Sequence, residues 1–116
     1  MKKIISLIVI CLLLTACSEK YKTITTNEAL ELINKGAIII DVRTAEEYNE
    51  GHIKGAINIP VDTIDSISYD KDDTIILYCA TGVRSTNAVN ILADMGYTSL
   101  YNLDGGLLNW GSDLEE

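Results

Sequence analysis

The chain has 116 residues, 47% of them hydrophobic, and carries a formal net charge of −8. A surface this acidic argues against nucleic acid as a partner and against attraction to anionic lipid by charge. The length is enough for one small domain with its own hydrophobic core and no more.

The first residues have the order of charges and apolar residues that is typical of a signal peptide. Lys2 and Lys3 precede an apolar run, Ile4–Leu14, that is only eleven residues long. A helix that spans a bilayer needs about 20 such residues, and the polar Ser18 ends the run early, so a retained membrane helix is not favoured. We therefore expect residues 1–16 to form a signal peptide.

A cysteine follows the expected cleavage point directly. Leu14-Thr15-Ala16-Cys17 resembles the lipobox of bacterial lipoproteins, which implies that Cys17 is lipidated and becomes the first residue of the mature chain. That implies a lipid anchor in the cell membrane on its extracytoplasmic side, at a periplasmic face or at the outer surface of the cell. The alternative is an ordinary signal peptide followed by an incidental cysteine.

Losing the signal peptide makes the mature chain still more acidic. It removes two lysines and no acid, so the formal net charge goes from −8 to −10. Such a chain is held at a membrane by its lipid and not by charge, and two acyl chains are enough for a stable anchor.

The cysteine count singles out one thiol. Cys11 is removed with the signal peptide and Cys17 carries the lipid, which leaves Cys79 of the three cysteines. A disulfide within the mature domain is therefore excluded, and Cys79 is either a nucleophile or a core residue. Because His52 is the only histidine, we expect no metal site, and nothing in the chain calls for a cofactor.

Helices and strands are expected to alternate along a single domain, residues 24–116, that follows a lipidated tether, residues 17–23. Two Thr-x-x-Glu capping boxes, Thr25–Glu28 and Thr44–Glu47, indicate helix starts. The first helix has an apolar stripe of Ala29, Leu30, Leu32 and Ile33, and it ends at Gly36. After it we expect a strand over 37–42, a short helix ending near Gly51, a loop over 52–55, a strand over 56–59 and a short helix over 61–67. The rest of the chain is expected to form a strand over 74–78, a helix ending at Gly96, a strand over 99–103, a turn over 104–106 and a short helix over 107–110.

The strand over 37–42 indicates how these elements pack. It is apolar without alternation until Asp41, which is typical of a strand covered on both faces. The sequence therefore predicts an α/β fold with a mainly parallel central sheet flanked by helices on both faces. At the end of this strand we expect Asp41 to bond nearby N–H groups and Arg43 to lie close enough to Glu47 to pair with it.

The strand over 74–78 delivers Cys79 into a short loop that leads to a helix. There a thiolate would be stabilised by loop N–H groups and by the helix dipole. Gly82 allows the backbone to curl around the sulfur, and Arg84 would lower the thiol pKa as a nearby cation. Such a sulfur can attack a sulfane sulfur and hold it as a persulfide.

Three stretches together resemble a known family. Cys79-Ala80-Thr81-Gly82-Val83-Arg84-Ser85 resembles the active-site loop of single-domain rhodaneses, C-x-x-G-x-R-S. Asp41-Val42-Arg43 with Glu47-Tyr48 and Gly51 to Pro60 resembles the first signature of that family, and Leu103 to Gly106 with Trp110 resembles its C-terminal signature. Three motifs in the right order over roughly residues 24–113 are specific, whereas one alone would be weak.

This resemblance implies a rhodanese-like fold and a sulfurtransferase. Cys79 would be the catalytic nucleophile, and Asp41, Arg43 and Glu47 would be structural supports. Ala80, Thr81, Gly82, Val83 and Arg84 would form the loop that binds substrate and persulfide. The donor would be thiosulfate, polysulfide or a persulfide. With no second thiol in the mature domain the acceptor must be external: cyanide, a small thiol, a reductant or a cysteine of a redox or acceptor protein.

Five alternatives to this interpretation remain open. Cys79 could fill the core, Arg84 could be an ordinary charge on a helix face, and His52 could be a general base instead of a structural residue. Thiol-dependent phosphatases use C-x₅-R, but here only four residues separate Cys79 from Arg84, which suits a single sulfur atom better than a phosphate. The last alternative is a non-catalytic rhodanese-like module that binds a partner or carries sulfur at the membrane surface.

Overall fold

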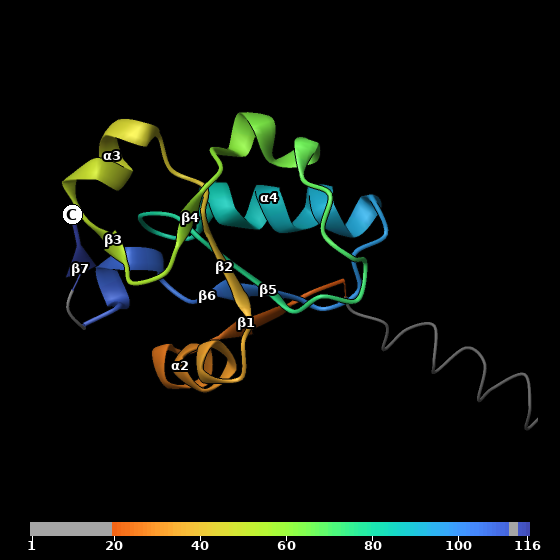
Figure 1. Cartoon of the computed structure of the whole chain (residues 1–116), viewed down its shortest axis with the longest axis horizontal. Coiled ribbons are helices and arrows are strands. Elements are labelled where there is room, and N and C mark those ends of the chain that lie inside the picture. The colour runs from red at the N-terminus through yellow and green to blue at the C-terminus, as the bar shows by residue number, and fades with distance from the viewer. Residues whose placement is uncertain (1–19, 112–113) are drawn as a thin grey trace, which may run out of the picture.

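Five parallel strands form the centre of the domain. The computed structural model describes residues 20–111 and 114–116. The strand order in the sheet is β1-β6-β5-β2-β4, and every pairing in it is parallel (Figure 1). The bounds are Lys22–Ile24 for β1, Ile38–Asp41 for β2, Ile57–Asn58 for β4, Ile75–Tyr78 for β5 and Leu100–Leu103 for β6.

Helices cover both faces of this sheet. The α-helices are α2 (Thr26–Asn34), α3 (Ala45–Glu50) and α4 (Val83–Asp94), and the 3₁₀ helices are η1 (Val61–Ser66) and η2 (Gly106–Asn109). In Figure 1, α4 and η1 lie on one side of the sheet and α2 lies on the other. The predicted α/β fold with a parallel sheet flanked on both faces is confirmed.

The central strand β5 explains why two cores form. All four of its side chains are fully buried, and alternate ones point to opposite faces. Ile75 and Leu77 belong to the cluster under α4, whereas Ile76 and Tyr78 belong to the cluster under α2. A strand with apolar side chains on both faces can be satisfied only between two layers of helix.

Both capping boxes form as predicted. The hydroxyl of Thr25 accepts from the Glu28 N–H, and that of Thr44 accepts from the Glu47 N–H, each at 3.2 Å. In return each glutamate carboxylate accepts from the N–H of its threonine, at 3.0 and 3.2 Å. The second box also fixes Glu47 close to the loop that follows Cys79.

Three sequence-based expectations are corrected by the fold. The tether was expected to extend to residue 23, but Lys22 and Thr23 lie in β1, which pairs with β6. The expected loop over 52–55 contains a strand, β3 (His52–Ile53), paired with the C-terminal strand β7 (Leu114–Glu115). Leu30, expected in the apolar stripe of α2, is 37% exposed.

The expected signal peptide and Cys17 lie outside the described residues. Within residues 20–111 and 114–116, no helix has the length and hydropathy that a membrane crossing requires.

Candidate active site

Cys79 lies where β5 leaves the sheet at its carboxyl end, and its side chain is only 1% exposed. The helix η2 holds the backbone at this point. The Leu107 N–H donates to the Cys79 carbonyl at 2.9 Å, and the Leu108 N–H donates to the Ala80 carbonyl at 3.2 Å. The thiol is thus fixed at the edge where parallel α/β sheets bind their ligands.

Two backbone N–H groups point at the sulfur. The Gly82 N–H donates to Cys79 Sγ at 3.0 Å, and the Ser85 N–H donates to it at 3.4 Å. Gly82 has a φ of +106°, which a glycine adopts without strain, and it is the N-cap of α4. Ser85 lies in the first turn of α4, where an N–H has no acceptor within the helix and is free to bond the sulfur.

The same groups set the acidity of the thiol. Burial alone would raise the pKa of Cys79. Hydrogen bonds that the sulfur makes with the Ser85 hydroxyl, and that it accepts from the N–H groups of Ser85, Gly82 and Thr81, outweigh burial and hold the pKa below its ordinary value. Because the thiolate is the nucleophilic form, these hydrogen bonds raise the fraction of Cys79 that is reactive at neutral pH.

Ser85 is the side chain that sequence reasoning missed at the site. Fully buried, it lies between the sulfur and β6: its Oγ is 3.5 Å from Cys79 Sγ and donates to Asn102 Oδ1 at 2.6 Å. The Asn102 Nδ2 in turn donates to Thr86 Oγ1 at 3.0 Å, and Thr86 Oγ1 donates to the Gly82 carbonyl at 2.6 Å. A closed polar network therefore links the loop, α4 and β6 behind the sulfur.

A signal for this network was present in the sequence. Asparagine is disfavoured inside strands, and Asn102 sits in the middle of an apolar strand pattern. Its burial, 6% exposed, requires polar partners, which Ser85 and Thr86 supply.

Arg84 does not bond the sulfur. Its Nη1 and Nη2 donate to the two oxygens of Glu47 at 2.7 and 3.0 Å, and this pair is partly exposed. The hydrogen bonds from Arg84 lower the pKa of Glu47 to about 2. The pKa of Arg84 is raised first by Glu47 and more weakly by the charge on Cys79. Arg84 therefore acts on the thiol only from a distance, and its direct contact joins the loop to α3.

The expected pairing of Arg43 with Glu47 is wrong. Arg43 instead forms a forked bond with Asp41, whose Oδ1 and Oδ2 accept from Nε at 3.0 and 3.1 Å and whose Oδ2 accepts from Nη2 at 2.7 Å. Arg43 Nη2 also donates to the Gly51 carbonyl at 2.7 Å. As expected, Asp41 bonds a nearby N–H, that of Arg43 at 2.9 Å. The buried pair ties the end of β2 to the end of α3.

The remaining predicted site residues divide by exposure. Ala80 and Gly82 are partly buried, whereas Thr81 and Val83 face solvent. The ring of His52 stacks on that of Tyr48 with a centroid distance of 3.7 Å, and its Nδ1 lies 2.9 Å from the Tyr48 carbonyl. This arrangement agrees with the structural role weighed for His52 and gives no support to a role as base.

Replacing Ser85 by alanine is expected to slow attack by the Cys79 sulfur at neutral pH by about tenfold to a hundredfold, because hydrogen bonds to a charged group contribute about 1.5–3 kcal/mol. Removing the hydroxyl raises the thiol pKa, so the thiolate forms only at higher pH. The acid limb of the rate profile should shift upward, and the rate should recover in alkaline solution. Thiolate absorbance against pH measures the shift directly.

A matched control for this prediction is Thr86→Ala. It removes a hydroxyl from the same network that does not touch the sulfur, and it should move the thiol pKa less. An unchanged pKa in Ser85→Ala would contradict the assigned role of the hydroxyl.

Replacing Gly106 by alanine is expected to destabilise the domain by about 1–3 kcal/mol, the usual cost of overpacking. A Cβ at this position would lie 2.4 Å from the Cys79 carbonyl oxygen and 2.8 Å from the Ala80 carbonyl. Relief of that clash moves η2 away from the backbone of Cys79, so activity should fall as well. Thermal unfolding and turnover are the measurements.

Gly96→Ala is the control for Gly106→Ala. Gly96 also has a positive φ, +101°, but nothing lies within 4 Å of its Cβ position. It should lose stability from backbone strain alone and keep full activity. Equal activity in the two variants would show that the contact of η2 with the loop is not needed.

Comparison with known proteins agrees with this geometry. Residues 25–113 match the family described as Rhodanese-like domain, and residues 1–18 match the Prokaryotic membrane lipoprotein lipid attachment site. A crystal structure of a rhodanese-like domain protein from Staphylococcus aureus superposes with a TM-score of 0.72 at 39% identity, covering 81% of this chain and 96% of that one.

Two curated relatives carry the name thiosulfate sulfurtransferase. PspE of Escherichia coli is 44% identical over 70 residues, which are 57% of this chain and 67% of that protein. GlpE of Shewanella oneidensis is 30% identical over 93 residues, 78% of this chain and 92% of that protein. The chain also matches the tRNA uridine(34) hydroxylase of Erwinia tasmaniensis at 32% identity, but spans only 25% of its length.

Proposed function

The chain belongs to the rhodanese-like family, and we propose that it is a sulfurtransferase that carries sulfane sulfur as a persulfide on Cys79. The observation that carries this proposal is the buried thiol with two N–H groups within 3.4 Å of its sulfur and a pKa held below the ordinary value. Such a site stabilises an anionic sulfur and so favours its action as a nucleophile.

The first half-reaction loads the enzyme. The Cys79 thiolate attacks the sulfane sulfur of the donor, a new S–S bond forms, and the leaving group departs with the electron pair of the broken bond. With thiosulfate the leaving group is sulfite. The product is Cys79–S–S⁻, and the N–H groups of Gly82 and Ser85 that stabilise the thiolate can also stabilise the terminal sulfur.

The second half-reaction unloads it. An acceptor thiolate or cyanide attacks the terminal sulfur, and the Cys79 thiolate leaves with the electron pair of the S–S bond. Cys79 is the only free cysteine within the described residues. Because Cys11 and Cys17 precede the domain, the acceptor is an external molecule.

The charges of the loop after Cys79 do not select one sulfur donor over another. Ala80, Thr81 and Val83 are neutral, and the charge of Arg84 is bound to Glu47. A doubly charged donor such as thiosulfate therefore gains no dedicated cation, and polysulfide or an organic persulfide is equally compatible. The pairing of Arg84 with Glu47 also leaves no free guanidinium for a phosphate, which weighs against phosphatase activity.

We also propose that Cys17 is lipidated and holds the domain on the extracytoplasmic side of the membrane. Support comes from the match of residues 1–18 to a lipoprotein lipid attachment site. The location is a periplasmic face or the outer surface of the cell.

A donor panel tests the proposed activity. The purified chain is incubated with thiosulfate, polysulfide or an organic persulfide, desalted, and weighed by mass spectrometry. We expect one added sulfur atom that disappears when cyanide or a thiol is supplied. A binding module that lacks catalysis would add no sulfur from any donor, and a phosphatase would instead hydrolyse an aryl phosphate in a Cys79-dependent way.

A further inference from the structure

Lys20, the first described residue of the chain, and the thiol of Cys79 lie toward opposite ends of the domain. Cys79 is at the carboxyl ends of the strands, beside the start of α4. From there α4 runs about 17 Å back to Asp94, which lies at the amino ends of the strands. There Asp94 Oδ1 accepts from Lys20 Nζ at 3.2 Å. Lys20 is therefore placed at the end of the domain remote from the sulfur.

Other neighbours of Lys20 agree with this placement. Lys20 lines a surface pocket with Thr98 and Ser99, which immediately precede β6. In Figure 1, β1 likewise begins at the end of the sheet opposite to α3 and η2.

The chain between the anchor and Lys20 is short. The orientation of the domain on a membrane depends on the proposed lipidation of Cys17. Three residue steps separate Cys17 from Lys20, and a fully extended chain spans at most about 11 Å in that length. This is less than the length of α4, which disfavours an orientation that lays the Cys79 edge of a domain anchored at Cys17 on the bilayer.

Most exposed charges lie at these two edges; the exceptions among the described residues are Glu31 on α2 and Asp62 and Asp65 on η1. Four of the five lysines after residue 19 lie in segments that precede or open a strand, together with four aspartates: Lys20, Lys22, Lys35, Lys71, Asp70, Asp72, Asp73 and Asp94. The charges of this set, which we call the amino edge, balance.

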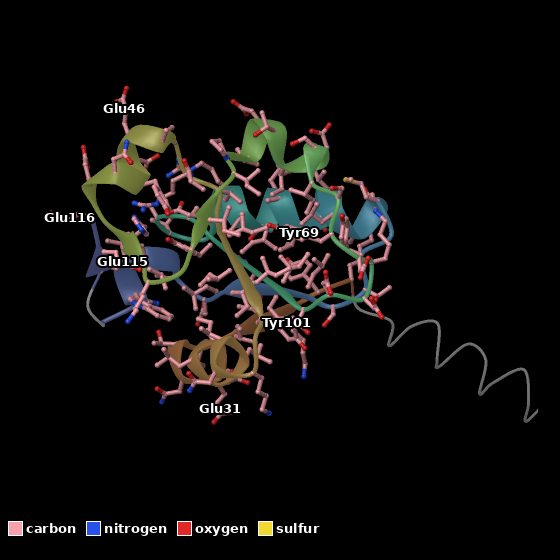
Figure 2. All side chains as sticks on the ribbon, in the orientation of Figure 1. Glu31, Glu46, Tyr69, Tyr101, Glu115 and Glu116 are labelled. Atoms are coloured by element: carbon pink, nitrogen blue, oxygen red, sulfur yellow. The ribbon has the colours of Figure 1, made fainter. Side chains whose placement is uncertain are left out.

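Segments around the carboxyl ends of the strands are strongly acidic in comparison. They carry six exposed acids and one lysine: Glu28, Glu46, Glu50, Asp104, Glu115, Glu116 and Lys54. Figure 2 shows Glu46, Glu115 and Glu116 on the α3 and β7 side of the molecule. Both arginines on this side are paired with carboxylates, so they do not offset the acids.

We propose that the amino edge of the domain rests on the lipid headgroups of an anionic membrane and that Cys79 opens toward the aqueous phase. Charge does not hold the protein there; the acyl chains do. Charge selects the orientation, because the acidic edge is repelled within a Debye length of about 8 Å from an anionic surface while the balanced edge is not. The donor and the acceptor therefore reach Cys79 from solution and not from within the bilayer.

Lipid-borne quenching tests this orientation. The lipidated full chain with Cys79→Ser carries one fluorophore at Asp72→Cys on the amino edge or at Glu46→Cys on the acidic edge. Both variants exchange an exposed acid for a labelled thiol, so their charge is matched. Each is bound to vesicles of phosphatidylcholine and phosphatidylglycerol that contain a headgroup nitroxide.

We expect the probe at position 72 to lose most of its fluorescence and the probe at position 46 to keep nearly all of it. Equal quenching, or stronger quenching at position 46, would overturn the orientation. If neither variant floats with the vesicles, the proposed anchor fails and the orientation fails with it, whereas sulfur transfer in the donor panel is unaffected. The pair Asp70→Cys and Glu50→Cys repeats the measurement should either first variant fold poorly.

Discussion

Replacement of Cys79 by serine is expected to abolish sulfur transfer, with turnover falling by at least about three orders of magnitude, as when the nucleophile of a covalent mechanism is removed. A serine hydroxyl is far less acidic than a thiol and cannot form a persulfide. The variant should take up no sulfur from any donor. Mass spectrometry after donor treatment and steady-state turnover are the measurements.

The fold should tolerate Cys79→Ser. Serine is close in size to cysteine, and its oxygen meets the N–H groups of Gly82 and Ser85 that now point at the sulfur. Unfolding by denaturant should therefore change little, which separates lost chemistry from lost structure.

A second control comes from the other end of the chain. Cys17→Ser should release the protein from the membrane and leave turnover unchanged, because Cys79 is the only thiol needed in each half-reaction. Sulfur uptake that survives in Cys79→Ser would identify another nucleophile and refute the mechanism.

Much of the fold could be predicted because local sequence patterns specify many of its helices and strands. The apolar run before Cys79 and the two capping boxes specify a buried strand and two helix starts without reference to the rest of the chain. The strands that escaped prediction lack such patterns. β1 has three residues with only Ile24 buried, and β3 and β7 have two residues each. They are strands only because a partner lies beside them.

In the site, too, the contacts within one short segment could be predicted, whereas those between distant segments could not. A thiol followed by a glycine loop and a helix start is a local arrangement, and it correctly indicated N–H groups around the sulfur. The ion pairs depend on tertiary structure. Glu47 lies four residues from Arg43 and 37 from Arg84, yet it pairs with Arg84. Spacing along the chain could not reveal this, because the turn of β2 into α3 directs Arg43 inward to Asp41.

Both ion pairs join two nitrogens of an arginine to the two oxygens of a carboxylate, but their surroundings differ. The side chains of Arg43 and Asp41 are 7% and 0% exposed, whereas those of Arg84 and Glu47 are 37% and 33% exposed. Breaking a buried pair leaves a charge without a partner or water, while breaking an exposed pair leaves both charges hydrated. The two arginines therefore form a matched comparison within one domain.

Arg43→Met is expected to destabilise the domain by about 3–5 kcal/mol, because the buried Asp41 carboxylate loses its cation. The free energy of unfolding of a small domain is only about 5–15 kcal/mol, so this loss would leave a large fraction of the molecules unfolded at physiological temperature. Methionine keeps much of the apolar stem of the arginine, so the loss measures the charge and its bonds rather than a cavity. Urea denaturation followed by circular dichroism gives the free energy of unfolding.

Arg84→Met should cost no more than about 1 kcal/mol, as is usual for exposed pairs, and should change activity more than stability. Restoring neutrality in the double variant Asp41→Asn with Arg43→Met should recover part of the stability lost in Arg43→Met, because no buried charge then remains without a partner. If Arg43→Met and Arg84→Met were equally stable, burial would not be what distinguishes the two pairs. The Asp41–Arg43 pair would then not be the support that holds the end of β2 and α3, and with them Glu47, beside the loop of Cys79.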